Sequence, residues 1–391
     1  MLLPPPTVEG VAVETQEKTD IMKPLFSMRY WLTAGILALG VFWSLGSSAE
    51  KQQGYPNDSL IVEAQWLNDH SQDNELVIVD VRTDKYFDGG LIPGAVRMPW
   101  SLFRYNDVGT KLASKFVGVG EAQRILGEHG VSRGDTVVLY DSVKRDGGAT
   151  ASYIFWVLDI LGHQKKMILE RGVDGWDAAG FERVASTSQP EALLYQAPLD
   201  EIRREEIIDG DFVYDRLGDF YYQIVDVRSA EEYRGKAGSK GLEGRALKLG
   251  HIPGAVNINY TSAWKDTADK DIKEYGELLS LFAGLDPSRA VIVYCASGRR
   301  SSFSYYILRL MGFDHVYTYE PSWQQWGDPG NYYPVETREN ILQTSTSSRP
   351  DVGKARTSAG RRQQHTPSAQ STGTSSGKNQ NASGGYISCG G

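Results

Sequence analysis

The stretch LVIVDVRTDKYFDGGLIPGAV at residues 76–96 decides the fold, because a second version of it occurs later in the chain. That version begins with IVDVRSAEEYRG at residue 224 and ends with GHIPGAV at residue 256. It is about 14 residues longer, and the additional residues lie in the Gly- and Lys-rich stretch 236–248. A repeat of about 150 residues indicates a duplicated domain, whereas the repeats of solenoids are far shorter.

The two copies also match further along the chain. TVVLYD at residues 136–141 corresponds to AVIVYC at residues 290–295, and a Gly-containing loop follows each. Helical apolar patterns then occupy residues 151–161 and 302–311. A glycine at the end of such a pattern is typical of a helix C-cap. The two glycines are Gly162 and Gly312, and the copies close at Trp176 and Trp326.

Short apolar runs alternate with the helical stretches in each copy. Apolar runs without polar alternation are typical of strands that are buried on both faces, as in a parallel sheet covered by helices. We therefore predict the α/β class, with two tandem domains that each hold a mainly parallel sheet flanked by helices. The predicted strands cover residues 77–79, 137–140, 224–227 and 291–294.

Changes in composition mark the expected domain boundaries. The domains are expected at residues 57–185 and 201–336, joined by a linker at residues 186–200 in which Ser, Thr, Gln and Pro cluster. Residues 337–391 consist mainly of Ser, Thr, Gly, Gln and Asn. Such a segment buries too little apolar surface to offset the entropy of ordering, so we expect a disordered tail.

Residues 1–49 are interpreted as an N-terminal extension with a signal peptide. The apolar run 30–45 is short for a bilayer span, which needs about 20 residues, but it suits the core of a signal peptide. Lys23 and Arg29 precede the run, and small residues lead up to a cleavage site after Ala49. We expect a periplasmic or secreted protein; the alternative is an uncleaved segment that anchors the protein in the inner membrane.

Charge and cysteine content exclude several classes of function. The net charge is −8, and residues 341–391 carry six basic side chains and one acid, which leaves about −13 for the remainder. An acidic body argues against nucleic acid as a partner, because phosphate binding needs a basic surface. Two cysteines, Cys295 and Cys389, exclude a disulfide framework and a Cys-based zinc site. We expect no metal and no cofactor.

The loop YCASGRRS at residues 294–301 carries the strongest chemical signal. It follows a predicted buried strand and opens a predicted helix, so backbone N–H groups and the positive helix end point into the loop. Both effects favour a thiolate at Cys295 and lower its pKa. Arg299 and Arg300 act in the same direction and can hold an anionic substrate, while Gly298 permits a tight backbone path. This setting favours a reactive cysteine over a buried structural one.

The whole pattern resembles the tandem-domain type of the rhodanese family of sulfurtransferases. The resemblance covers residues 57–336 and rests on the paired Asp-Val-Arg motifs, the GHIPGAV segment, the Cys295 loop and the closing tryptophans. In that family the C-terminal domain carries the catalytic cysteine and the N-terminal domain has lost it. In agreement, Asp141 stands where Cys295 stands in the other copy. The resemblance implies that Cys295 is catalytic and that the first domain is silent and helps to wall the pocket.

The same resemblance implies a double displacement. Cys295 takes the outer sulfur of thiosulfate, or the sulfur of 3-mercaptopyruvate, and the resulting persulfide passes it to cyanide or another thiol. The implied partners are a small sulfur donor and a thiophilic acceptor, with a protein thiol as the alternative acceptor; a monomer is expected, since two domains can form their own pocket. The loop residues expected to bind substrate are Ala296, Ser297, Gly298, Arg299 and Arg300.

Two further arginines are candidates for substrate binding. Arg228 belongs to the second Asp-Val-Arg motif. It either contacts a substrate carboxylate or sulfonate, as the resemblance allows, or pairs structurally with Asp226. Arg245 lies near the position at which mercaptopyruvate-type enzymes carry a carboxylate-binding arginine.

The loop also separates the candidate activities. A phosphatase loop, Cys-x5-Arg, would need arginine at position 301, where this chain has Ser301. The mercaptopyruvate loop type, Cys-Gly-Ser-Gly-Val-Thr, is matched at Ser297 and Gly298 but not at the two arginines. Basic loop residues suit the thiosulfate dianion, so we rank thiosulfate first and mercaptopyruvate second. A third hypothesis is a persulfide carrier for an exported partner, with Cys389 in a docking or relay tail.

Overall fold

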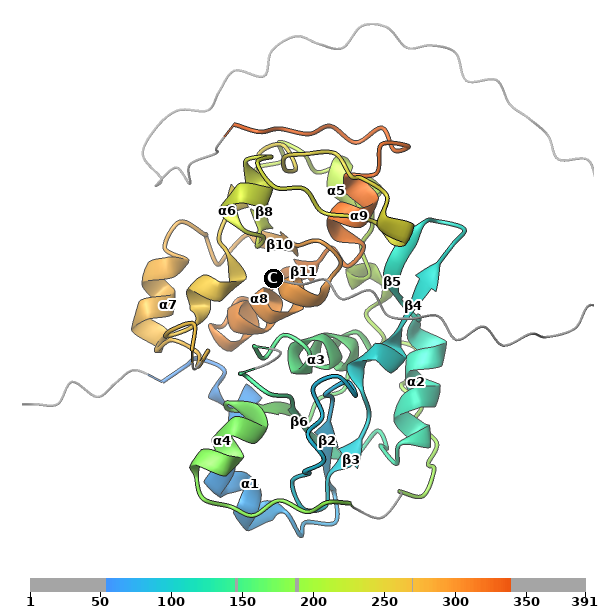
Figure 1. Ribbon diagram of the computed structural model, residues 1–391, viewed down its shortest axis with the longest axis vertical. Coiled ribbons are helices and arrows are strands. Elements are labelled where there is room, and N and C mark those ends of the chain that lie inside the picture. Colours follow the sequence, from blue (N-terminus) through green and yellow to red (C-terminus); the bar gives the residue numbers. More distant parts are fainter. Residues whose placement is uncertain (1–53, 145–146, 187–189, 269, 339–391) are drawn as a thin grey trace, which may run out of the picture. The chain divides into compact units, whose positions relative to one another are not determined.

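The structure is a computed structural model that describes residues 54–338, except 145–146, 187–189 and 269 (Figure 1). The expected signal segment, nearly all of the tail and Cys389 lie outside the described residues. Within the described part, no helix combines the length and apolar character needed to cross a membrane.

The first domain is built on a parallel sheet with the strand order β1-β7-β6-β2-β3. Its central pair, β2 and β6, is parallel and places Asp80 opposite Tyr140 at the carboxyl ends of the strands. Helices cover the sheet (Figure 1). The strands are β1 (Ile61–Val62), β2 (Leu76–Asp80), β3 (Val96–Arg97), β6 (Thr136–Tyr140) and β7 (Lys166–Leu169), and the helices are α1 (Ala64–His70), α2 (Val119–Glu128), α3 (Ala151–Ile160) and α4 (Gly172–Ala178).

The second domain repeats this design with the strand order β11-β10-β8-β9. Its central pair, β8 and β10, is again parallel and places Asp226 opposite Tyr294, so the register of the first domain is reproduced. The strands are β8 (Tyr222–Asp226), β9 (Val256–Asn257), β10 (Ala290–Tyr294) and β11 (Val316–Thr318), and the helices are α5 (Gly210–Tyr214), α6 (Ala230–Tyr233), α7 (Tyr275–Leu281), α8 (Arg299–Leu310) and α9 (Ser322–Trp326).

The predicted fold class is therefore confirmed. Each expected apolar run forms a strand within one or two residues of its predicted ends. The largest difference is at α8, which begins at Arg299, three residues before the predicted start at residue 302. The additional turn is polar, and this is why the apolar pattern missed it. The consequence is that both loop arginines belong to the first turn of a helix.

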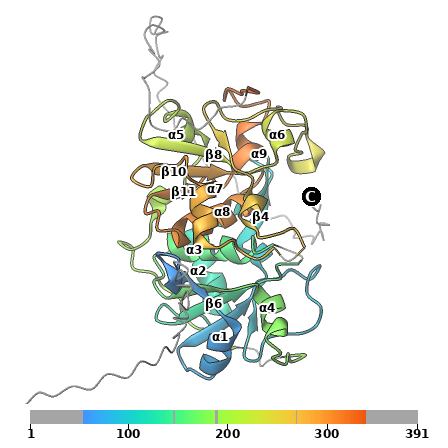
Figure 2. The same ribbon diagram turned by 90° about the vertical axis from the view of Figure 1, so that its left-hand side faces the viewer.

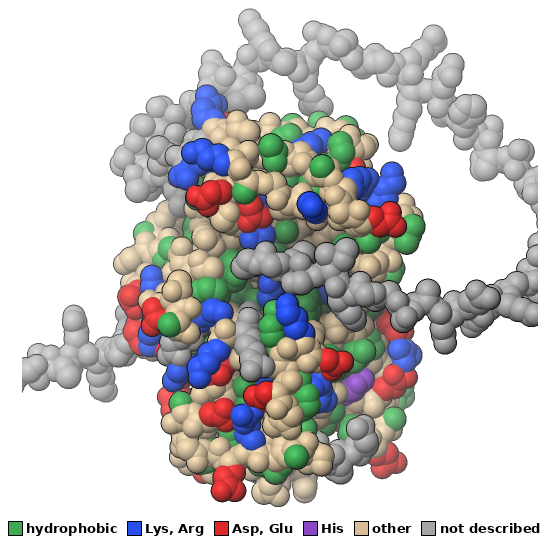
Figure 3. All heavy atoms as spheres, in the orientation of Figure 1, with side chains coloured by type: hydrophobic (Ala, Val, Ile, Leu, Met, Phe, Trp, Pro, Cys, Tyr) green, Lys and Arg blue, Asp and Glu red, His purple; other side chains and the backbone are tan. Residues whose placement is uncertain are grey.

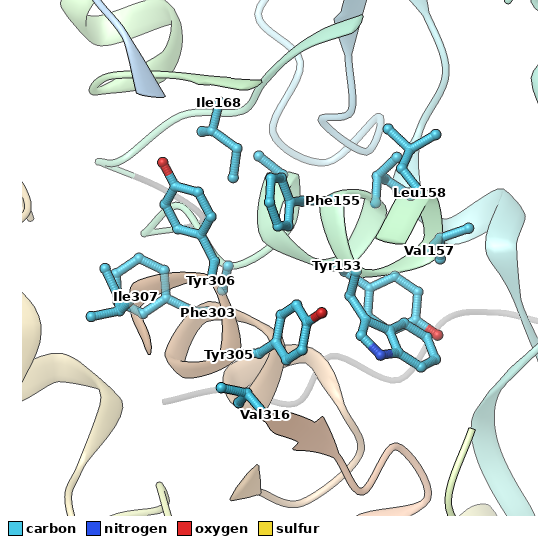
Figure 4. Close-up of a cluster of buried hydrophobic side chains, with 14 of the residues drawn as sticks. Tyr153, Phe155, Val157, Leu158, Ile168, Phe303, Tyr305, Tyr306, Ile307 and Val316 are labelled. Carbon is cyan, nitrogen blue, oxygen red and sulfur yellow. The ribbon is translucent and has the colours of Figure 1, made fainter. Parts of the chain in front are cut away.

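Helices α3 and α8 pack against each other between the two sheets (Figure 1, Figure 2). Every residue of α3 is buried, as expected for a helix whose side chains are mostly apolar on all sides. Aromatic side chains of the two helices meet edge to face, with the ring centroids of Phe155 and Tyr306 5.1 Å apart (Figure 4). One hydrophobic core therefore includes residues of both domains.

A buried polar group joins the two domains beside this core. The Tyr305 hydroxyl of α8 donates to Asp159 of α3 at 2.7 Å, and Lys166 lies 2.7 Å from the same carboxylate. A buried carboxylate with both an ion-pair partner and a hydrogen-bond donor is well compensated for its loss of water. The contact consequently links the two domains at a defined position.

The hairpin of β4 (Arg104–Asp107) and β5 (Leu112–Phe116) extends from the first domain toward α9 of the second (Figure 1). The Ala113 N–H of β5 donates to the Gln324 side-chain oxygen of α9 at 2.7 Å. On the face shown in Figure 3, basic and acidic side chains are interspersed over both domains. The hairpin thus brings the first domain to the loop that carries Cys295.

Candidate active site

The Cys295 loop lies between β10 and α8, at the carboxyl end of the strand. Cys295 is the first residue after β10, and Gly298 is the N-cap residue of α8. The cysteine is 1% exposed. Its sulfur is therefore enclosed by the loop, at the sheet edge where open α/β proteins bind their ligands.

Helix α9 holds two carbonyl groups of this loop. The Trp323 N–H donates to the Cys295 carbonyl oxygen, and the Gln324 N–H donates to the Ala296 carbonyl oxygen, both at 3.1 Å. The C=O and N–H groups of a trans peptide point in opposite directions, so the following N–H groups turn toward the inside of the loop. In agreement, the Ser297 N–H donates to Cys295 Sγ at 3.4 Å.

Ser322, the first residue of α9, supports the cysteine from below the loop. Its hydroxyl oxygen accepts from the Cys295 N–H at 3.1 Å, and its hydroxyl donates to the Tyr319 carbonyl oxygen at 2.7 Å. Ser322 has a φ of +53°, a left-handed conformation that is uncommon for a non-glycine residue. Strain of this kind persists where the surrounding structure enforces it, and it is concentrated at functional sites.

The pKa of the Cys295 thiol is lowered from its ordinary value. Burial by itself raises the pKa, but the Arg300 charge, the Ser297 N–H and the Ser301 hydroxyl and N–H together outweigh it. The Ser301 hydroxyl also lies 2.9 Å from the Gly298 carbonyl oxygen, so its single proton serves one acceptor at a time. The N-terminal end of α8 contributes in the same direction. The loop thus favours a thiolate, as the sequence predicted.

Arg300 is held rigidly beside the sulfur. Its guanidinium makes a two-pronged ion pair with Glu232 of α6, with N–O distances of 2.8 and 3.0 Å. Burial opposes the charge of Arg300, but Glu232 and Cys295 raise the pKa of the guanidinium above its ordinary value. Arg299 is half-buried in the same helical turn. Arg300 is therefore a permanent positive charge whose position Glu232 determines.

Arg228 lies in a buried ion pair away from open solvent. It is 1% exposed, and its Nη2 lies 2.6 Å from Asp226. The first domain contains the same pair, with Arg82 2.7 Å from Asp80. Since that domain has no cysteine at the equivalent position, the pair is explained by the fold. The arrangement supports the structural role that the sequence left open, and substrate contact by Arg228 stays a prediction.

Arg245 lies where the hairpin of the first domain meets α9. Its guanidinium pairs with Asp328, just after α9, and its Nη2 is 3.4 Å from the Lys111 carbonyl oxygen in the hairpin turn. The side chain is 27% exposed. Its predicted contact with substrate also stays a prediction, and its contacts with Asp328 and Lys111 place it at the boundary of the two domains.

Four residues near the sulfur were not found from the sequence. Glu232 belongs to a capping box with Ser229, a pattern that could have placed it at the start of a helix but not beside Arg300. Ser322 and Glu320 flank the start of α9, and Arg104 comes from the other domain. Nothing in the local sequence indicates that Arg104 donates to the Ser297 carbonyl oxygen.

Comparison with known proteins agrees with this architecture. A family model described as a rhodanese-like domain matches the chain twice, at residues 63–179 and 210–328. The thiosulfate sulfurtransferase of Corynebacterium glutamicum is 31% identical over 294 residues, which are 73% of this chain and 93% of that relative. The sulfur carrier protein TtuD of Thermus thermophilus is 29% identical over 286 residues, which are 70% of this chain and 96% of the relative.

Solved structures show the same fold. The anaerobic ergothioneine biosynthesis enzyme from Chlorobium limicola, in complex with trimethyl histidine, has a TM-score of 0.58 and 24% identity, over 71% of this chain and 70% of that one. The crystal structure of YnjE has a TM-score of 0.61 and 21% identity, over 74% and 71% of the two chains. Since the family model matches both domains and includes the Cys295 loop, the chain belongs to the rhodanese family of sulfurtransferases.

Proposed function

We propose that the protein transfers the outer sulfur of thiosulfate to a thiophilic acceptor through a persulfide on Cys295. The observation that carries the proposal is a buried sulfur with a lowered pKa, which accepts a backbone N–H and faces the charge of Arg300. Such a thiolate is an activated nucleophile.

In the first step, the Cys295 thiolate attacks the outer sulfur of thiosulfate. A sulfur–sulfur bond forms between Cys295 and the outer sulfur. The bond between the two sulfur atoms of thiosulfate breaks, and sulfite leaves with the bonding electron pair. The persulfide carries one negative charge on its terminal sulfur, and the loop N–H groups are suited to stabilise it. This step needs no added oxidant, since the outer sulfur of the donor is already at the oxidation level of sulfane sulfur.

In the second step, cyanide or a thiolate attacks the terminal sulfur of the persulfide. Thiocyanate or a new persulfide is released, and the Cys295 thiolate is regenerated. Arg299 and Arg300 support thiosulfate as the donor, because two guanidinium groups at one helical turn suit a dianion. The name of the Corynebacterium relative supports the same donor. 3-Mercaptopyruvate is the alternative donor.

The test is steady-state turnover with thiosulfate and cyanide, compared with 3-mercaptopyruvate and a thiol. We expect robust thiocyanate formation, lost in Cys295→Ser. After incubation with thiosulfate alone, the intact mass should increase by about 32 Da, one sulfur atom, for the persulfide intermediate. Faster turnover with 3-mercaptopyruvate than with thiosulfate would assign the other donor.

A persulfide carrier is a second candidate, favoured by the relative named a sulfur carrier protein. It would hold sulfur stoichiometrically and pass it to a partner protein, with negligible turnover on small molecules. The same mass measurement, combined with slow thiocyanate formation, would identify this behaviour.

We also propose that the mature protein is exported after cleavage behind Ala49. The support is the apolar run at residues 30–45 with basic residues before it and small residues after it. The N-terminal sequence of the protein purified from its native host tests this proposal. A chain that retains the apolar run in the membrane fraction would favour the anchored alternative.

A further inference from the structure

We propose that Arg104, a residue of the first domain, is a positioning residue for the Cys295 loop of the second. By binding the Ser297 carbonyl oxygen, it turns the Gly298 N–H toward the sulfur. The inference deepens the proposed function, since it rests on Cys295 as the sulfur-accepting group. It gives the domain that lacks a cysteine a defined part in the chemistry.

The loop has three successive carbonyl groups, and each is held from outside. Those of Cys295 and Ala296 accept N–H groups of α9, within the same domain. That of Ser297 accepts Nη2 of Arg104, across the domain boundary. Each of the three carbonyl oxygens therefore has its own donor, and the donor to the third one, Arg104, belongs to the first domain.

The peptide before Gly298 shows what this series does. Where α9 holds the Ala296 carbonyl oxygen, the N–H on the opposite side of the same peptide, that of Ser297, reaches the sulfur at 3.4 Å. The peptide between Ser297 and Gly298 is planar in the same way, so a donor on its carbonyl directs the Gly298 N–H to the opposite side. Among the described residues, Arg104 is the donor that fixes the rotation of this peptide, because Gly298 with a φ of +88° is conformationally permissive.

Arg104 is itself held firmly for this purpose. Its side chain is 4% exposed, and its guanidinium carbon lies 5.2 Å from the Trp100 ring centroid and 4.9 Å from that of Tyr153. Glu320 accepts from Arg104 at 3.2 Å and from the Tyr153 hydroxyl at 3.1 Å. The planar guanidinium therefore has one orientation, set by two rings and a carboxylate.

Glu320 adds an electrostatic reason for the arginine. A Cβ placed on Gly298 would lie 3.3 Å from a Glu320 carboxylate oxygen, so this carboxylate adjoins the loop. Burial raises the pKa of Glu320, and the Arg104 charge acts against that rise. An unpaired carboxylate here would oppose a thiolate or persulfide in the same loop. Arg104 compensates this charge while it orients the peptide.

Holding the two domains together would not require Arg104 to bind a carbonyl oxygen of the Cys295 loop. The domains already share the core of α3 and α8 and the contact of Tyr305 with Asp159. Arg104 instead donates to a backbone atom two residues from the reacting sulfur. Two of its nitrogens, Nε and Nη1, are buried with no hydrogen-bond partner among the described residues. Burying a charge with two unpaired donors is costly, so stability alone does not account for an arginine at this position.

The experiment compares Arg104→Met with Arg124→Met in the full chain. Methionine retains an unbranched apolar stem beside the two rings but removes the charge and the donors. Arg124 lies in the same domain on α2, is 53% exposed and pairs with Glu121 and Glu128, so its variant matches the change in charge without touching the loop. Two quantities are measured: the pH dependence of Cys295 alkylation by iodoacetamide, and turnover with thiosulfate and cyanide.

In Arg104→Met we expect the apparent pKa of Cys295 to rise by about one unit. We expect kcat/KM to fall about tenfold to hundredfold, a little less than the loss of an entire oxyanion-hole donor. Arg124→Met should match the wild type in both. An unchanged alkylation profile in a folded Arg104→Met protein, or the same change in Arg124→Met, would overturn the inference.

Two provisions keep the test decisive. If Arg104→Met does not fold, as judged by circular dichroism, Arg104→Gln replaces it. The glutamine side chain is neutral and two atoms shorter, so it loses the charge and the reach to the Ser297 carbonyl oxygen; a rise in the Cys295 pKa is again expected, and a wild-type profile would overturn the inference. If the wild type shows no turnover with any small donor, the proposed function fails. The alkylation profile still tests Arg104, because alkylation needs no sulfur donor.

Discussion

The loops after β6 and β10 occupy equivalent places in the two domains, and they hold an anion in different ways. After β6, the Asp141 carboxylate accepts the Thr150 N–H at 3.1 Å, the Thr150 hydroxyl at 2.7 Å and the Ala151 N–H at 3.0 Å. After β10, the Cys295 sulfur accepts the Ser297 N–H. The first domain thus satisfies the start of its helix with its own carboxylate, whereas the second directs its N–H groups toward a reactive sulfur.

The helices that contact these loops, α4 in the first domain and α9 in the second, differ in the same way at their first residue. The Val173 N–H donates to the Asp141 carbonyl oxygen at 2.9 Å, as the Trp323 N–H does to that of Cys295. The preceding residue is left-handed in both domains, but it is Gly172 in the first and Ser322 in the second. The backbone connection is retained in both copies. The strained residue with a hydroxyl occurs where the sulfur needs support.

Replacing Cys295 and Asp141, the two equivalent residues, by serine should produce the largest difference in turnover between the two domains. Cys295→Ser should reduce thiocyanate formation below detection, because a serine hydroxyl cannot form a persulfide. Asp141→Ser should leave the turnover number of the folded protein close to that of the wild type. Measurement of kcat with thiosulfate and cyanide checks both, and comparable losses in the two variants would show that the loops do not differ as described.

The charge next to the sulfur should have the second-largest effect. Arg300→Met removes the strongest influence that lowers the Cys295 pKa and leaves the effect of burial, so the pKa should rise. At a pH below the wild-type pKa of Cys295, each unit of increase reduces the thiolate fraction about tenfold, so alkylation at such a pH should slow in proportion. The pH profile of alkylation measures the shift. A profile that coincides with that of the wild type would show that the Arg300 charge does not lower the Cys295 pKa.

The first loop should matter for stability more than for chemistry. Asp141→Ala leaves three donors without their acceptor in a site that is 2% exposed, which should cost about 1–3 kcal/mol of the free energy of unfolding. Asp177→Ala on α4, whose carboxylate is 43% exposed beside Arg183, is the matched control and should change stability far less. Urea unfolding of the two variants measures the difference; equal midpoints would contradict a structural role for Asp141.

The smallest expected effect concerns Glu232 at low pH. Burial opposes its charge, but the hydrogen bonds and charge of Arg300 lower its pKa to about 2 from the usual 4.5. A folded-state pKa below the unfolded value stabilises the fold above about pH 4.5, and this contribution is lost as the pH falls toward 2. Unfolding curves at pH 5 and pH 3 should therefore differ more in the wild type than in Glu232→Gln. The same pH dependence in both proteins would exclude this linkage.

Much of the architecture could be read from the sequence because the chain contains the fold twice. A buried strand such as β10 has an apolar run that needs no partner to be recognised, and the repeated Asp-Val-Arg motif aligns the copies. The polar first turn of α8 was missed, since apolar spacing carries no signal where the helix faces a site. Glu232 was missed because its partner, Arg300, is 68 residues away in the sequence.

By itself, the sequence determined the class of the fold, the duplicated domains and Cys295 as the candidate nucleophile. These features depend on local patterns, namely which residues follow a buried strand and open a helix. The tertiary structure decided which charges surround the sulfur and which atoms orient its loop. Arg104 and Ser297 are 193 residues apart, and only the packing of one domain on the other brings the guanidinium to that carbonyl oxygen. The reason is physical: hydrogen bonds and charge pairs act over a few ångströms in space, whatever the distance along the chain.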